Sequence, residues 1–274
     1  MKAARFEYAR PATMPQALEL LAHHGNDGAP LAGGQSLMPM MNLRLATPAV
    51  LVDIGRIPGL ADIALAGDRL VIGAMARHAD MLASSLVREH APLLSSALVH
   101  VAHAAIRNRG TLGGSLSLAD PAAELPACMV CLDAEIRLIS VRGERVVAAA
   151  DFFKGTYATN RAPDELLVSV AVPRLQSGWR FSFDEFARRR GDFAIAGLAF
   201  GAKLAAGRIE QCRVAFCGVE DAPRRLQGAS LDEVRETATR ELRPSSSVDA
   251  PAAYRVRLAL ALLDRAGAAL VSAA

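Results

Sequence analysis

The chain has 274 residues, of which 52% are hydrophobic and 22% are charged, values typical of a globular protein with one large domain and a smaller one. The net charge of +3 is the small difference between 31 basic and 28 acidic side chains, which argues against a nucleic-acid-binding protein. We expect no signal peptide, because residues 1–7 lead into no apolar segment, and no membrane span, because Asp264 and Arg265 interrupt the apolar stretch 258–271. We therefore expect a cytoplasmic protein.

The first 176 residues are predicted to mix helices with short strands. A capping box formed by Thr13 and Gln16 begins the first helix, and Gly25 ends it. Further helices are expected over 77–90, over 92–107 and from Asp120 onward, with Pro121 in the first turn of the last one. Strands are predicted at 50–54, 69–74 and 166–172, together with a hairpin over 135–147 that turns at 142–144.

The pattern changes near residue 176. Three antiparallel strands are predicted near 180–187, 194–205 and 209–219, with a tight turn at 206–208. Two helices follow, one capped by Ser230 with Glu233 and one from Pro251 to about Leu270. Strands followed by helices indicate a separate α+β unit, so the sequence predicts an α+β protein with domains at 1–176 and 177–274.

The four cysteines are predicted to be buried thiols in a reducing compartment. Cys128 and Cys131 form a CxxC pattern, which also suits a metal half-site or a redox pair, but they lie in an apolar helical segment. Cys212 and Cys217 are five residues apart in a predicted strand and therefore point to opposite faces. Four ligands do not converge, so we expect no iron–sulfur cluster and no metal site on this chain.

Two short glycine-rich stretches are the main candidates for a ligand site. They read Ala32-Gly33-Gly34-Gln35-Ser36 and Thr111-Leu112-Gly113-Gly114-Ser115. Glycine permits positive φ and close approach, so such a turn can point several backbone N–H groups at one anion. Either stretch alone is also typical of a plain tight turn. Two of them in one domain suggest a clamp on a diphosphate.

Other common chemistries are not indicated. The sequence contains no GxGxxG dinucleotide fingerprint and no GxxxxGK[ST] phosphate loop. Ser36 and Ser115 lack the GxSxG context of a hydrolase nucleophile. The six histidines form no metal-binding pattern, and His100 and His103, on one predicted helical face, are expected to pack or cap. We therefore predict no catalytic acid, base or nucleophile on this chain.

The residues around the glycines carry a family resemblance. The segments LAGGQSLMPMMNLRLATP (31–48), IRNRGTLGGSLSLADPAAELP (106–126) and FARRRGDFA (186–194) resemble three signatures of the FAD-binding medium subunits of molybdenum hydroxylases, the carbon monoxide dehydrogenase and xanthine dehydrogenase family. The resemblance runs from about residue 3 to the end of the chain, in order and without large insertions. It implies an FAD-binding domain of the molybdopterin-dehydrogenase type with lobes at about 1–55 and 56–176, followed by a smaller C-terminal α+β domain with a three-stranded antiparallel sheet and helices.

The resemblance also implies how FAD is held. The cofactor would lie extended between the two lobes, with its pyrophosphate on the N–H groups and hydroxyls of both glycine stretches. Glu124 matches an acidic contact to a cofactor hydroxyl, while Asp120 either contacts the cofactor or caps the following helix. Leu167 and Phe193 match positions beside the flavin ring, although Phe193 also suits core packing. The implied cofactor-binding residues are Leu31, Ala32, Gly33, Gly34, Gln35, Ser36, Leu37, Val101, Thr111, Gly113, Gly114, Ser115, Asp120, Glu124, Leu167 and Phe193.

One departure from the family concerns charge near the flavin. Many relatives carry a lysine in the segment before the double arginine, where this chain reads Phe183-Asp184-Glu185-Phe186. This segment therefore has no lysine to stabilise a reduced, anionic flavin, and either Arg188 or Arg189 replaces it or the flavin potential is lower.

By resemblance, the chain is an electron-transfer subunit. A molybdopterin large subunit would oxidise the substrate, and a [2Fe–2S] small subunit would pass the electrons to this FAD. The resemblance implies a dimer of such heterotrimers. The external acceptor would be a quinone, oxygen or NAD. Two alternatives remain open: a self-sufficient FAD-dependent oxidase or reductase, and a non-catalytic assembly subunit that has lost FAD.

Overall fold

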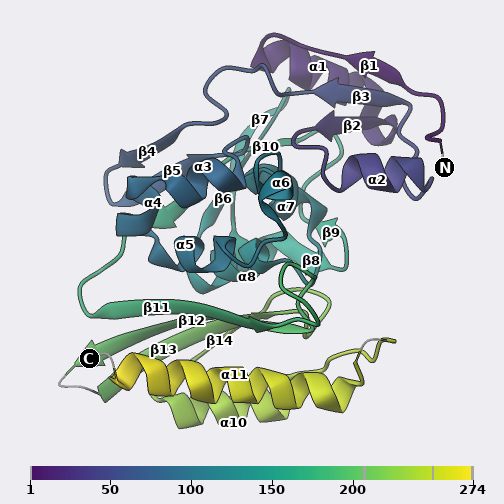
Figure 1. Ribbon diagram of the computed structural model, residues 1–274. Coiled ribbons are helices and arrows are strands. Elements are labelled where there is room, and N and C mark those ends of the chain that lie inside the picture. The colour runs from purple at the N-terminus through teal and green to yellow at the C-terminus, as the bar shows by residue number, and fades with distance from the viewer. Residues whose placement is uncertain (1, 206–207, 249, 273–274) are drawn as a thin grey trace.

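The computed structural model describes residues 2–205, 208–248 and 250–272. Its N-terminal lobe, at the top of Figure 1, is a parallel sheet of order β1-β3-β2 (Glu7–Ala9, Val50–Asp53 and Gly28–Leu31). Helix α1 (Met14–His24) packs on this sheet through Ala17 and Leu21, and the short helix η1 (Gly25–Asp27) follows it. The capping box is wrong in detail, because Thr13 makes no side-chain cap and Gln16 accepts a hydrogen bond from Ala12 N instead.

The second lobe is built on a five-stranded antiparallel sheet of order β4-β5-β10-β6-β7. Its strands are Ile63–Ala66, Arg69–Gly73, Leu166–Pro173, Glu135–Ser140 and Gly143–Ala148 in that order. The predicted strands and the predicted hairpin are confirmed. A short connection holds helix α9 (Ala149–Phe152) and the strand pair β8 (Phe153–Gly155) and β9 (Ala158–Thr159).

The helices of the second lobe are shorter than predicted. The stretch 77–90 divides into α3 (His78–Ala83) and α4 (Ser85–His90), because extended Ser84 caps α4 by accepting a hydrogen bond from Val87 N. The stretch 92–107 divides into α5 (Pro92–Leu98) and α6 (Ala104–Arg107), with Ala102 at φ 42° between them. Helix α8 (Glu124–Cys131) begins four residues later than expected.

The C-terminal domain has one strand more than the three predicted. Its antiparallel sheet has the order β11-β12-β13-β14 (Trp179–Phe186, Ala196–Ala205, Arg208–Cys217 and Arg225–Gly228). Helices α10 (Leu231–Glu241) and α11 (Ala252–Ser272) cover one face. The capping box at α10 is confirmed, since Ser230 Oγ accepts from Glu233 N and Glu233 Oε2 accepts from Ala229 N. The predicted tight turn falls largely on 206–207, outside the described residues.

Both faces of this sheet are buried. One face packs against α10 and α11, and Cys212 belongs to that core. The other face packs on α5 and α8 of the FAD-binding part, and Cys217 belongs to the core formed there with Cys128 and Cys131. All four cysteines are free and buried, and the opposite orientation of Cys212 and Cys217 is confirmed.

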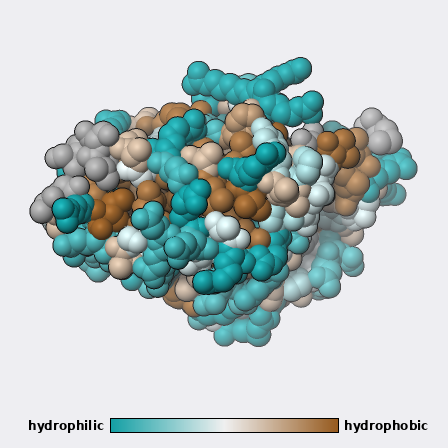
Figure 2. Space-filling view, turned by 90° about the horizontal axis from the view of Figure 1, so that it is seen from below, coloured by the Kyte–Doolittle hydropathy of each residue, from teal (hydrophilic) through white to brown (hydrophobic). Residues whose placement is uncertain are grey.

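The surface on the side of α10 and α11 is largely polar, with smaller apolar patches between polar residues (Figure 2). Within the described ranges, no helix is long and apolar enough to cross a membrane. The same residues contain no group of three or more His, Cys, Asp or Glu side chains arranged to hold a metal ion.

Candidate cofactor-binding site

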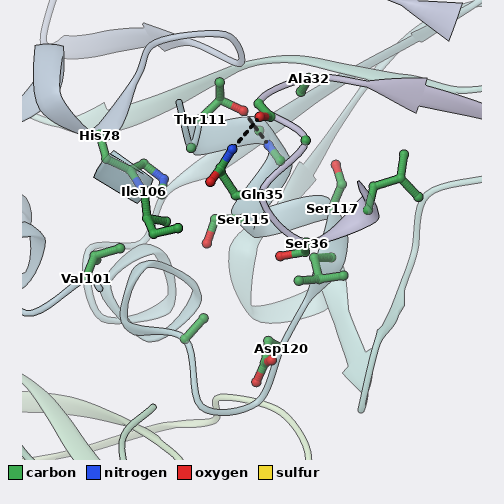
Figure 3. A pocket seen from close by; sticks show the side chains of 18 of the residues that line it. Ala32, Gln35, Ser36, His78, Val101, Ile106, Thr111, Ser115, Ser117 and Asp120 are labelled. Atoms are coloured by element: carbon green, nitrogen blue, oxygen red, sulfur yellow. Dashed lines mark hydrogen bonds between the residues drawn. The ribbon is translucent and has the colours of Figure 1, made fainter. Parts of the chain in front are cut away.

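A cavity of about 510 Å³ lies where the two lobes and the β11–β12 loop meet. Every residue of the set implied by the family resemblance lines it except Leu31. Leu31 lies beneath the first glycine loop, where its Cδ1 is 3.4 Å from the position that a Cβ on Gly34 would take. Segments far apart in the sequence thus meet around one cavity, as Figure 3 shows for Gln35, Ser115 and Asp120.

The first glycine stretch is an irregular loop with unused donors. It connects β2 to helix α2 (Leu37–Asn42), and Gly34 takes a φ of 72°, which favours glycine. Gln35 Nε2 donates to the carbonyl of Gly33 at 3.1 Å and holds the loop in shape. Within the described part of the chain, no hydrogen bond uses the backbone N–H groups of the four consecutive residues 33–36. Free N–H groups gathered in one loop suit an anion.

The second glycine stretch is the start of a helix, which differs from the predicted turn. Thr111 is the N-cap of α7 (Leu112–Leu118), and its Oγ1 accepts from Gly114 N at 3.2 Å. Gly113 N donates to Ala74 O at 2.8 Å, and Ser115 N donates to Thr111 O. These N–H groups are therefore already bonded within the protein. The polar side chains that line the cavity here are the hydroxyls of Thr111 and Ser115, together with Ser117 just after the stretch (Figure 3).

Glycine is required in both stretches for close packing. A Cβ on Gly33 would overlap the carbonyl oxygen of Arg109, which precedes the second stretch. A Cβ on Gly113 would lie 2.6 Å from Ala74 Cβ at the end of β5. The first stretch thus packs against the residues that precede the second stretch, and the second stretch packs against Ala74. Together they form a single wall of the cavity.

The two acidic residues of the second signature have different environments. Asp120 Oδ1 accepts from Ala122 N at 2.9 Å, and Oδ2 accepts from the Tyr157 hydroxyl at 3.2 Å. Asp120 therefore fixes the turn before α8, and its predicted role as helix cap is wrong because Ala123 is the N-cap. Glu124 is 8% exposed, and burial, reinforced by Glu185, raises its pKa to about 7. Near neutral pH its carboxyl can thus donate as well as accept a hydrogen bond, which the sequence did not suggest.

The side chains expected beside the flavin ring line the same cavity. Leu167, in β10, is buried, and Val101 is buried between α5 and α6. Phe193, in the β11–β12 loop, is 68% exposed and lies at the mouth of the cavity. The alternative that Phe193 packs in the core is therefore wrong.

Several lining residues were missed by the sequence analysis. They include His78, Ala102, Ile106, Gly110, Ser117 and Arg161. Arg161 is cationic, and its guanidinium donates to the carbonyls of Ala162 and Glu165 at 3.1 and 2.7 Å. No motif surrounds it, because it reaches the cavity from the loop before β10. In the place of the expected lysine, Asp184 pairs with Arg265 and Glu185 faces His100.

The chain was then compared with known proteins. Residues 4–175 match the family described as the FAD-binding domain in molybdopterin dehydrogenase, and residues 181–270 match the carbon monoxide dehydrogenase flavoprotein C-terminal domain. The chain belongs to the FAD-binding medium subunits of the molybdenum hydroxylase family. The medium subunit is thus part of an oxidoreductase, and its predicted fold class is confirmed apart from the additional strand β14.

Relatives of this medium subunit match over nearly its whole length. It is 37% identical to the 6-hydroxypseudooxynicotine dehydrogenase complex subunit alpha of Paenarthrobacter nicotinovorans, over 97% of this chain and 94% of the relative. It is 34% identical to the carbon monoxide dehydrogenase medium chain of Afipia carboxidovorans, over 95% of each. A solved carbon monoxide dehydrogenase from Hydrogenophaga pseudoflava superimposes with a TM-score of 0.93 at 34% identity, over 97% of this chain and 96% of that one.

Proposed function

We propose that this chain is the electron-transfer subunit of a multi-subunit molybdenum hydroxylase, receiving electrons from a [2Fe–2S] subunit and passing them to an external acceptor. A molybdopterin subunit would oxidise the substrate, and the holoenzyme would be a dimer of heterotrimers in the cytoplasm. We also propose a domain boundary near residue 176, which the two family matches, ending at 175 and beginning at 181, support.

The observation that carries the proposal is the loop 33–36, whose four residues line the cavity and whose backbone N–H groups have no hydrogen bond among the described residues. These donors would hold the diphosphate of FAD, and the hydroxyls of Thr111 and Ser115 would add contacts from the second glycine stretch, which adjoins the loop. Arg161 adds positive charge to the same space. The residues present therefore fit the cofactor that the family requires.

Bound FAD supplies the redox chemistry, because a flavin can exchange electrons singly with an iron–sulfur cluster and in pairs with an acceptor. The protein's part is to bind and orient the ring. Leu167 would support the ring from β10, and exposed Phe193 would limit access of water at the mouth of the cavity. A positioned acid or base is not needed for this role.

The proposal is tested by titrating the FAD-free full chain with FAD and following flavin fluorescence and the visible bands. Gly34→Ala should weaken FAD binding at least tenfold, because a side chain at φ 72° is strained and its Cβ would be 3.3 Å from Met38 Cγ. Gly67→Ala is the matched control. Gly67 has a φ of 60° with nothing within 4 Å of its Cβ position, and it lies outside the cavity, so FAD binding should be unchanged.

The same preparation separates the alternatives. A chain that never binds FAD would be the non-catalytic assembly subunit. A chain that binds FAD and oxidises an organic substrate without other subunits would be the self-sufficient oxidase. The proposed role requires that FAD in the purified chain is reduced only when the iron–sulfur subunit is present, and that the native complex contains iron and molybdenum.

A further inference from the structure

We propose that Glu124 takes up a proton when FAD binds, so that cofactor binding and protonation of this carboxyl are coupled. The inference rests on the proposed function, because it needs the FAD diphosphate to enter the cavity that Glu124 lines. The carboxyl and the diphosphate would then share one cavity. Like charges in a poorly solvated space disfavour each other, and the group that can take a proton does so.

The surroundings of Glu124 give a negative charge little compensation. The residue begins α8 at the cavity wall and is buried. Titratable groups face it from each neighbouring element: Asp120 before α8, Cys128 within α8, Cys217 on β13, Glu185 on β11 and His100 between α5 and α6. Of these groups, only His100 can carry positive charge, when its ring is protonated.

His100 is already engaged with a second acid. Its Nδ1 lies 3.5 Å from Glu185 Oε1, and the Glu185 side chain is buried, with no hydrogen-bond partner for Oε2 among the described residues. The contact with Glu185 raises the pKa of His100, against the opposing effect of burial. For Glu124, burial and the charge of Glu185 outweigh both its own backbone N–H and His100, which is why its pKa is raised.

The donors that favour an anion belong to other parts of the cavity wall. They are the N–H groups of the loop 33–36 and the guanidinium of Arg161. These groups would draw in the diphosphate without offsetting the charge on Glu124. Where these donors offset one of the two charges of the diphosphate, the remaining charge, at a separation of about 10 Å and an effective dielectric constant of about 20, would strengthen proton binding by the Glu124 carboxylate roughly tenfold.

A tenfold coupling has two measurable consequences. With a pKa of about 7 in the FAD-free protein, binding at pH 7.5 should take up about half a proton per FAD. The Kd for FAD should also rise by roughly eightfold between pH 6 and pH 9, because the protein with an ionised Glu124 carboxylate binds FAD about ten times more weakly than the protein with a protonated one.

The test is isothermal titration calorimetry of the FAD-free full chain with FAD, at pH 7.5 in PIPES and in Tris, neither of which contains phosphate. The two buffers differ in heat of ionisation, so the difference in binding heat gives the number of protons taken up. Glu124→Gln should abolish the uptake and give the same Kd at pH 6 and pH 9, while Glu124→Asp should retain uptake. His100→Gln should retain uptake and move it to higher pH, because Glu124 loses the cation that faces it.

Proton uptake that persists unchanged in Glu124→Gln, or that disappears in His100→Gln while Glu124 is intact, would assign the proton to another group and overturn the inference. FAD binding with no proton exchange in the wild type would overturn it and leave the proposed function standing. Failure of the wild type to bind FAD at any pH would refute the proposed function itself. Near-UV circular dichroism of each FAD-free variant confirms that it is folded.

Discussion

His78 should limit the stability of the FAD-free protein, and replacing it should make that form more stable. Its ring is buried at the start of α3, and neither ring nitrogen has a hydrogen-bond partner among the described residues. Burial, together with the charge of Arg107, lowers the pKa of His78 to about 4. The neutral ring therefore carries a desolvation cost of about 1–3 kcal/mol, which His78→Leu would remove.

The pH dependence gives a second, independent magnitude. In the unfolded chain, His78 binds a proton below a pH of about 6.5, whereas the folded ring stays neutral until the pH falls to about 4. The free energy of unfolding therefore decreases as the pH falls from 6.5 toward 4. At pH 5 that loss is about 2 kcal/mol, and it is nearly absent at pH 7.5. His78→Leu should therefore gain about 2 kcal/mol more over the wild type at pH 5 than at pH 7.5.

Urea unfolding of the FAD-free chain at the two pH values measures both effects. His78→Gln is the matched control, because it cannot titrate but keeps a buried polar group. It should show the extra gain at pH 5 and no gain at pH 7.5. A His78→Leu variant that is less stable than the wild type at pH 7.5, or whose advantage is equal at both pH values, would refute the reasoning.

Two further predictions concern the walls of the cavity. Gly33→Ala should lower the free energy of unfolding by about 1–3 kcal/mol in urea titrations, because the added Cβ overlaps Arg109 O. It should also weaken FAD binding, because that overlap pushes the two glycine stretches apart. An unchanged FAD affinity would contradict this prediction. Thr111→Ala should cost about 1 kcal/mol through loss of the cap on Gly114 N, whereas Thr111→Ser should restore most of it; equal losses in both variants would show that the hydroxyl does not act as a cap.

The sequence predicted the cavity better than the elements that form it. The three signatures assigned residues as distant as Gly34, Glu124 and Phe193 to one site through their resemblance to the family, and all three line the same cavity. The glycines at 113 and 114 indicated a turn, but tertiary contacts overrode that preference: Thr111 caps a helix whose first N–H groups pair with residues after β5.

Other features carried no local signal. His78 and Arg161 reach the cavity from the start of α3 and the loop before β10, where the flanking residues belong to no motif. Strand β14 has only four residues, and its pairing with β13 depends on a partner earlier in the chain. The break between α5 and α6 depends on Ala102, an alanine at positive φ that sequence rules do not anticipate.

The C-terminal sheet has one further consequence. Its inner face is continuous with the core of α5 and α8, and the loop after β11 supplies Gly191 and Phe193 to the cavity. A cut of the chain at the junction of the two family matches would thus expose the apolar side chains of α5 and α8 in the N-terminal part. The same cut would remove Gly191 and Phe193 from the lining of its cavity. The two domains match separate families in sequence, but they share one apolar core and one cavity, so we expect that separate expression of the two fragments would not give a first part that binds FAD.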